Sequence, residues 1–209
     1  MNRPSARSGS GSAESRLVLA SRSPRRRRIL SELGVEFDLV APEVEELIAG
    51  EPEALVLENA RRKARAGREL VAGEATVLGV DTDVVLEGTV LGKAEDERGA
   101  RERLEALSGR THEVLSGLVL LTDSVAHETP VERAGVSVTE VTFRELDETT
   151  IELYLRSGEW RDRAGAYTIQ GLGSILVETL RGDFSNVVGL PVALLLQLAP
   201  NLMPAARKP

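Results

Sequence analysis

The segment VLGVDTDVVLEG, residues 77–88, joins a strongly apolar run to three polar residues, Asp81, Thr82 and Asp83. Its valines and leucines predict a buried strand over 75–80 that breaks at Asp81 and resumes as VVLEG. Carboxylates there are costly unless they are solvated, paired or bound to a metal, and ligands gather at strand ends in α/β sheets. Because side chains alternate along a strand, those of Asp81 and Asp83 should point to one face of the sheet and that of Thr82 to the other. The segment therefore indicates either a ligand site or a polar hairpin turn.

The elements around this segment alternate between strand and helix in the first half of the chain, and strands cluster in the second half. Apolar, β-branched runs predict strands at 16–20, 35–40, 75–80, 112–122, 131–146 and 174–182. Helical spacing with Ser, Pro and Gly at the boundaries predicts helices at 24–34, 52–73, 91–109, 147–158 and 190–200. The two long strands are expected to pair as a hairpin around residues 123 to 130. The pattern predicts an α/β fold with a mixed, twisted β-sheet flanked by helices.

Length and composition favour one domain over residues 16–199, with a disordered Ser/Gly/Arg-rich lead-in at 1–15 and a C-terminal tail at 200–209. No stretch approaches the roughly 20 apolar residues needed to span a bilayer. The chain has no cysteine, which excludes disulfides and thiolate metal sites. These features predict a cytoplasmic protein that does not enter a membrane.

The net charge and the aromatic content limit the kinds of ligand that the protein can bind. The formal net charge is −7 at pH 7 and aromatic residues make up 3% of the chain. Stable nucleic-acid binding relies on phosphate neutralisation and on aromatic platforms for the bases, so this composition argues against it. A protein with a net negative charge can still bind a small anionic ligand in a locally basic pocket.

A basic cluster follows the first predicted strand, in LVLASRSPRRRRIL, residues 17–30. Ser23 suits an N-cap and Pro24 the first helical position. Helix phase then turns Arg26 toward the core side, with Arg25 at its flank, and it turns the next two arginines toward water. Because helix N-termini attract anions, the turn from Ser21 to Arg26 is a candidate phosphate cradle. The alternative is an ordinary strand-to-helix turn with no ligand.

Lysine is scarce, since only three of the 26 Lys and Arg residues are lysines: Lys63, Lys93 and Lys208. An ammonium is a compact point charge that a guanidinium does not replace well, so Lys63 and Lys93 are candidates for contact with a ligand oxygen. The alternative, for either lysine, is that it is a surface residue with no functional role. The two histidines, His112 and His127, have no partner motif at ligand spacing, and both are expected to be structural.

A glycine-rich loop, RAGAYTIQGLGS at 163–174, carries Gln170. Its side-chain amide offers both a donor and an acceptor, which suits the edge of a nucleobase. Taken alone, such a loop is equally well explained as a turn.

Six blocks in order resemble the motifs of the Maf family of nucleoside triphosphate pyrophosphatases: LASRSPRR, GVDTDVV, LGKAEDE with LSGRTHEV, VTFR, RAGAYTIQG and GDFSNVVGLP. The similarity runs from Leu17 to Pro191, and it implies the Maf/ITPase-like architecture. It also implies hydrolysis of a nucleoside triphosphate to the monophosphate and pyrophosphate with a divalent cation, Mg²⁺ or Mn²⁺. The ligands of that metal are not assigned.

The resemblance also implies roles for individual residues. Asp81 matches the catalytic aspartate, expected to act as the base that activates water, and Glu46 matches an acidic position that helps with metal or water. Lys63 and Lys93 match lysines expected on the phosphates, with Arg26 beside them. These are the two lysines that the composition singles out within the predicted domain.

Base choice within the family is linked to three positions, occupied here by Arg25, Thr82 and Gln170. This combination resembles the branch that acts on dTTP and UTP, whereas the 7-methyl-GTP branch carries Trp, Gln and Glu at these positions. A glutamine amide complements the mixed edge of uracil or thymine. Departures from the family pattern include Asp83 in place of an apolar residue and Thr168 in place of glycine.

Two other functions are compatible with these residues. One is a house-cleaning hydrolase of modified nucleotides, and the other is a non-catalytic nucleotide-sensing division regulator. The expected partner is a nucleoside triphosphate in each case. Whether the chain forms a homodimer is left open.

Overall fold

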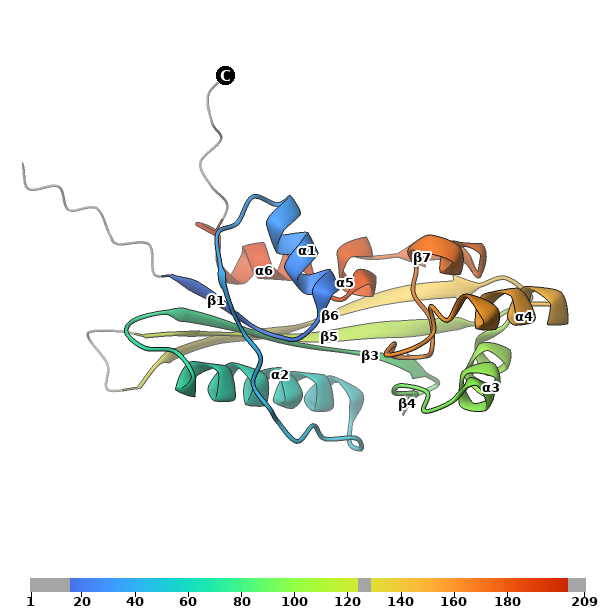
Figure 1. The fold of residues 1–209 in the computed structure, drawn as a ribbon, viewed down its shortest axis with the longest axis horizontal. Coiled ribbons are helices and arrows are strands. Elements are labelled where there is room, and N and C mark those ends of the chain that lie inside the picture. The colour runs from blue at the N-terminus through green and yellow to red at the C-terminus, as the bar shows by residue number, and fades with distance from the viewer. Residues whose placement is uncertain (1–15, 124–128, 203–209) are drawn as a thin grey trace, which may run out of the picture.

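The computed structural model describes residues 16–123 and 129–202, which form a seven-stranded mixed sheet with helices on both faces (Figure 1). The predicted lead-in at 1–15, His127 and most of the predicted tail lie outside the described residues. The strands are β1 (Leu17–Ala20), β2 (Asp38–Val40), β3 (Thr76–Leu86), β4 (Thr89–Val90), β5 (Thr111–Thr122), β6 (Val131–Phe143) and β7 (Val177–Arg181). Their order is β2-β1-β3-β5-β6-β7, with β4 paired to β3. β1 is parallel to β2 and β3, and the other pairs are antiparallel, which confirms the predicted mixed sheet.

The helices are α1 (Pro24–Glu32), α2 (Pro52–Glu69), α3 (Glu97–Leu107), α4 (Glu148–Ser157), the 3₁₀ helix η1 (Gly171–Ile175), α5 (Phe184–Val188) and α6 (Val192–Leu198). Figure 1 shows α2 on one face of the sheet and α1, α5 and α6 on the other. Sequence reasoning missed the short helix α5. It also began the third helix six residues too early, because the Asp96 side chain caps α3 at the Gly99 amide and Lys93 forms a β-bridge with Ala164.

β3 does not break at Asp81, so the predicted interruption is wrong. The strand pairs with β5 without a gap from Thr76 opposite Thr122 to Val85 opposite Glu113. This partner satisfies the backbone groups of the Asp-Thr-Asp segment, so the polar side chains need not end the strand. The turn comes later, at Glu87 and Gly88, which both have positive φ.

The other edge of β3 is open where these polar residues lie. Pairing with β1 ends at Gly79, and pairing with β4 begins only at Val85. Side chains that point to opposite faces of the sheet can therefore reach the same opening from above and below.

Two glycines let α2 lie directly on the sheet. A Cβ atom on Gly79 would lie 2.2 Å from the carbonyl oxygen of Ala60, and one on Gly117 would lie 2.3 Å from that of Val56. Neither distance is possible for real atoms, so both positions require glycine. The close approach brings the side chains of α2 within reach of Asp81, two residues along β3 from Gly79.

The core is divided on either side of this opening. One hydrophobic cluster, around Leu19, Leu78 and Leu118, packs under α1 and α6. Another, around Phe143 and Tyr154, packs against α3 and α4 at the far end of the sheet. β3 spans both clusters, so the open edge lies between two separately packed regions. No helix among the described residues is long and apolar enough to cross a membrane.

Candidate active site

A cleft of about 950 Å³ lies over the open edge of β3. Segments from both faces of the sheet line it, including the β1–α1 turn, the loop before α2, α2 itself and the loop after β4. The structure brings eight of the nine predicted site residues to this cleft: Ser21, Arg25, Arg26, Glu46, Lys63, Asp81, Thr82 and Lys93. Residues more than 70 positions apart in the sequence thus share one cavity.

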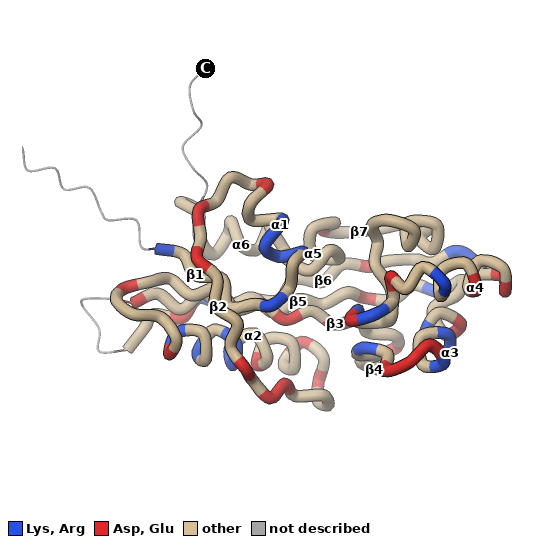
Figure 2. The backbone as a smooth tube through the Cα atoms, viewed as in Figure 1, with Lys and Arg blue, Asp and Glu red and all other residues tan. Residues whose placement is uncertain are grey.

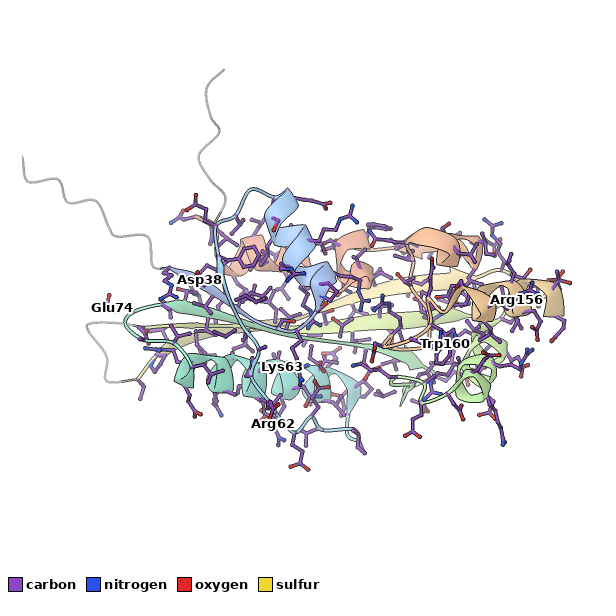
Figure 3. The ribbon with its side chains drawn as sticks, viewed as in Figure 1. Asp38, Arg62, Lys63, Glu74, Arg156 and Trp160 are labelled. Atoms are coloured by element: carbon purple, nitrogen blue, oxygen red, sulfur yellow. The ribbon has the colours of Figure 1, made fainter. Side chains whose placement is uncertain are left out.

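Lys63 and two carboxylates form the centre of the cleft. The Lys63 ammonium lies 2.5 Å from Asp81 Oδ1 and 2.8 Å from Glu46 Oε1. The side chains of Lys63 and Asp81 are only 12% and 10% exposed, whereas Glu46 is 46% exposed. In Figure 3, Lys63 lies nearer the sheet than its neighbour Arg62. Both carboxylates thus contact the same ammonium group at the centre of the cleft.

Asn59 is a site residue that sequence reasoning missed. It lies one helical turn before Lys63 and is 2% exposed. Its Nδ2 donates to Asp81 Oδ2 at 3.2 Å and to the Leu47 carbonyl at 3.0 Å, and its Oδ1 accepts from the Leu47 amide at 2.7 Å. The available signal was a polar residue in register with the buried stripe that includes Val56 and Ala60.

Arg26 forms the opposite wall. As predicted from helix phase, Arg26 is buried while Arg27 and Arg28 are exposed. Arg26 donates to the Gly189 carbonyl at 2.7 Å, to Thr82 Oγ1 at 3.0 Å and to Ser21 Oγ at 3.4 Å. Burial lowers the pKa of the Arg26 guanidinium, and the nearby negative charges of Asp81 and Glu46 act in the opposite direction.

The β1–α1 turn differs in detail from the expected cap. Ser23 occupies the N-cap position of α1, but its side chain makes no capping hydrogen bond. The Ser23 amide instead donates to Ser21 Oγ at 3.1 Å. The Ser21 hydroxyl thus accepts from the Ser23 amide, which stabilises the turn, and from the Arg26 guanidinium, which helps to position that side chain. Figure 2 shows the basic positions of α1 and of α2 on opposite sides of the sheet, so positive charge borders the cleft from both faces.

Gln170 does not line this cleft. It is exposed and lines a smaller pocket of about 210 Å³ together with Arg25 and Val188. Arg25 borders both cavities, and its Nε donates to the Val188 carbonyl at 3.1 Å. Thr82 lies in the larger cleft, where its hydroxyl is bonded to Arg26 and, at 2.8 Å, to Ser116. The structure therefore brings Arg25 next to Gln170 but does not bring Thr82 and Gln170 to one pocket.

Lys93 lies at the other end of the cleft on a well-anchored loop. Arg103 donates to the carbonyls of Leu91 and Lys93 at 2.9 and 3.1 Å, and Asp83 accepts from the Gly92 amide at 3.1 Å. The Lys93 side chain is exposed toward the cleft. Arg163, in the glycine-rich loop, also lines it. Burial lowers the Arg163 pKa.

Asp83 is a third carboxylate on the wall. Burial raises its pKa to about 6, and the negative charges of Asp81 and Glu46 act in the same direction. Hydrogen bonds from the Val84 and Gly92 amides oppose that shift. Asp83 therefore binds a proton more tightly than an ordinary aspartate does.

Oxygen ligands for a divalent cation are present but few. Within residues 16–123 and 129–202, no group of three or more His, Asp or Glu side chains is placed to hold a metal ion. Asp81 and Glu46 nevertheless lie close enough together for both to contact the Lys63 ammonium, and carboxylates are the ligands that Mg²⁺ and Mn²⁺ prefer. Mg²⁺ commonly uses one or two carboxylates together with substrate phosphates and water. The residues fit such a cation if a phosphate ligand completes its coordination.

His112 lies outside the cleft in a buried aromatic cluster. Its Nε2 lies 2.8 Å from the Tyr167 hydroxyl, and its ring packs edge-on against Phe143 with centroids 4.9 Å apart. The residue is 2% exposed. Burial lowers the His112 pKa to about 4, so the imidazole is neutral at physiological pH.

This depressed pKa predicts a pH-dependent stability. As the pH falls below 6.5, the unfolded chain binds a proton at His112 that the folded protein does not accept until about pH 4. Between pH 7 and pH 5 this should remove about 2 kcal/mol of the free energy of unfolding. His112→Gln should be less stable at pH 7, but its loss between pH 7 and pH 5 should be smaller by that amount. Urea titrations of both proteins at the two pH values measure it, and equal losses would contradict it.

Fold and site together define a class of protein. An open strand edge of a mixed α/β sheet, bordered by carboxylates, lysines and arginines, suits a small polyanionic ligand with a divalent cation. The chain belongs to the Maf family: residues 16–202 match the family model described as Maf-like protein. The resemblance seen in the sequence motifs is thereby confirmed.

Curated relatives cover most of the chain. A protein named dTTP/UTP pyrophosphatase from Thermococcus gammatolerans is 48% identical over 182 residues, covering 87% of this chain and 94% of the relative. Proteins of the same name are 43% identical in Deinococcus radiodurans, covering 88% and 91%, and 44% identical in Vibrio cholerae, covering 85% and 93%. Among solved structures, the Staphylococcus aureus Ham1 protein aligns with a TM-score of 0.42 and 14% identity, over 61% of this chain and 71% of that one.

Proposed function

We propose that this protein hydrolyses dTTP and UTP to the nucleoside monophosphate and pyrophosphate. The observation that carries the proposal is the Asp81–Lys63–Glu46 group in a cation-lined cleft, in a chain whose curated relatives bear the name dTTP/UTP pyrophosphatase. A cavity of about 950 Å³ is of the size expected for a nucleotide.

In this proposal Asp81 orients the attacking water and accepts its proton. The water oxygen bonds to the α-phosphorus, the bond from that phosphorus to the bridging oxygen breaks, and pyrophosphate leaves. Asp81 suits this role because it is held at both oxygens, by Lys63 and Asn59, while it still borders the cleft. A carboxylate fixed in this way loses little entropy when the water binds.

The cations of the cleft neutralise the triphosphate. Lys63, Lys93 and Arg26 border it from three different elements, and charge that develops on the leaving pyrophosphate is stabilised by such preorganised groups. Asp81 and Glu46 would hold the divalent cation between the protein and the phosphates. When bound, the cation would add further neutralisation of the phosphate charge.

The base of the nucleotide is assigned to the smaller pocket beside the cleft. Arg25 borders both cavities, so a triphosphate in the cleft could extend its base past Arg25 toward Gln170. The Gln170 amide would then pair with the mixed donor and acceptor edge of thymine or uracil. Thr82 would act indirectly, since its hydroxyl orients the Arg26 guanidinium.

Pyrophosphate release from a panel of nucleotides tests this function. With Mg²⁺ present and dTTP, UTP, CTP, dGTP and 7-methyl-GTP at equal concentrations, kcat/KM for dTTP and UTP should exceed the others at least about tenfold, because a pocket that hydrogen-bonds one base leaves its polar groups unpaired against another. Equal turnover across the panel would contradict the assignment of dTTP and UTP. Binding of dTTP without turnover would favour a nucleotide sensor instead.

A further inference from the structure

We infer that Asn59 is a positioning residue for both carboxylates of the site. It acts on Asp81 through a direct hydrogen bond and on Glu46 through the adjacent residue, Leu47. The inference rests on the proposed function, because it concerns the step assigned there to Asp81.

Both N–H groups and the amide oxygen of Asn59 have hydrogen-bond partners. Its Nδ2 has two N–H groups, and its two acceptors are Asp81 Oδ2 at 3.2 Å and the Leu47 carbonyl at 3.0 Å. Its Oδ1 accepts from the Leu47 amide at 2.7 Å. The side chain is 2% exposed, so water does not compete for these partners. An asparagine in this environment joins the loop, the helix and the strand in one network.

The partners permit only one orientation of the amide. The backbone N–H of Leu47 can only donate, so the amide oxygen must face it. An ionised carboxylate can only accept, so the NH₂ group must face Asp81. The reverse orientation would place the amide oxygen against the carboxylate and would leave two donors facing each other at Leu47.

Asn59 and Lys63 divide the two oxygens of Asp81 between them. They are four residues apart on one face of α2, and Lys63 contacts Oδ1 while Asn59 contacts Oδ2. Two donors from one rigid helix fix both the position and the rotation of the carboxylate. Its remaining lone pairs are left for the water and the cation of the proposed reaction.

The second effect of Asn59 is on the loop that carries Glu46. Residues 41–49 contain no helix or strand, and the loop crosses in front of the sheet on its way to α2 (Figure 1). Both backbone groups of Leu47 bind Asn59, which holds the preceding residue beside the Lys63 ammonium. Glu46 is 46% exposed, so packing alone does not hold it there.

Two substitutions at Asn59 test this positioning role. Asn59→Leu removes every hydrogen bond of the side chain. Asn59→Asp keeps the oxygen that accepts from the Leu47 amide, but it replaces the NH₂ group, which donates to both Asp81 and the Leu47 carbonyl, with a carboxylate oxygen that repels both. At pH 8 with dTTP and Mg²⁺, both should lower kcat about 10- to 100-fold and change KM less than about threefold. Should Asn59→Leu fail to fold, the nearly isosteric Asn59→Asp carries the test alone.

The matched control is Asp123→Ala, which loosens the other end of α2. Asp123 accepts from Arg68 Nε and from the Ala75 amide, both at 2.9 Å, and it lies far along the sheet from Asp81. This variant should lower Tm but keep kcat within about twofold of wild type, because the contact it removes joins α2 to the sheet and not to Asp81.

The inference is overturned if Asn59→Asp keeps kcat within threefold of wild type, since turnover would then not need the donor to Asp81. It is also overturned if Asn59→Asp raises KM with kcat unchanged, or if Asp123→Ala lowers kcat as much as Asn59→Leu. Asp81→Asn is assayed beside them. If Asp81→Asn retains turnover, the proposed base is wrong and this inference fails with it. If Asp81→Asn is inactive and Asn59→Asp is normal, only the role of Asn59 is wrong.

Discussion

Asp81→Asn should lower the rate of pyrophosphate release from dTTP about 1,000-fold or more, while dTTP still binds. Asparagine preserves the size of the side chain but does not accept a proton from water, and loss of a positioned general base costs about 10²- to 10⁴-fold. The change also leaves the amide NH₂ facing one of two donors, Lys63 or Asn59, so the side chain is no longer held at both atoms. Nucleotide affinity should change little, because the loss of one oxygen ligand to the cation is offset by the removal of a negative charge that repels a polyanion.

The measurement combines single-turnover pyrophosphate release with calorimetric binding of a nonhydrolysable dTTP analogue. Asp123→Asn is the matched control, because it makes the same change in an aspartate that is also partly buried and also paired with a basic side chain, Arg68. It should keep the wild-type rate within about twofold. More than a tenth of the wild-type rate in Asp81→Asn would refute the base assignment. Loss of analogue binding would indicate that Asp81 mainly holds the ligand or its cation.

Lys63→Met should lower kcat/KM for dTTP about 100- to 1,000-fold. Methionine has a similar unbranched shape but no charge, so the phosphates lose one cation, and removal of one preorganised group at a transition state costs about this much. In addition, Asp81 and Glu46 would face each other without the ammonium that lies 2.5 and 2.8 Å from them. Their repulsion would displace both carboxylates from the cleft.

Two further variants sharpen the test of Lys63. Lys63→Arg keeps the charge, but a planar guanidinium is too wide to take the same position between the two carboxylates, so activity should recover only in part. Arg65→Met removes a cation from the outer side of the same helix, where the side chain is 63% exposed, and should change kcat/KM less than about twofold. Steady-state kinetics with dTTP measure all three variants. A loss below tenfold in Lys63→Met, with wild-type Tm, would contradict a role at the phosphates.

Much of the site was accessible from local patterns. The phase of a single helix was enough to predict that Arg26 is buried and that Arg27 and Arg28 are exposed, because the apolar residues after them define the inward face. The scarcity of lysine singled out Lys63 and Lys93, and both line the cleft.

Three features could not be read from the chain. The continuity of β3 through Asp81 depends on β5, which supplies backbone partners from 28 or more residues further along. The separation of Gln170 from Thr82 depends on where the glycine-rich loop packs against α1. The role of Asn59 depends on three hydrogen bonds, two of them to the backbone of Leu47, and backbone partners leave no trace in side-chain identity.

The sequence by itself determined the mixed α/β class, the family and the residue types of the site, because hydrophobic periodicity, helix boundaries and ordered motifs are local properties. The tertiary structure alone decided how those residues meet. Gly79 and Gly117 let α2 approach the sheet, and the ladders of β1 and β4 stop short of each other. These contacts between distant segments place Asp81 and Thr82, on opposite faces of one strand, in the same cleft. The physical reason is that the open edge of a strand exposes both faces, and only the pairing of the whole sheet determines where such an edge lies.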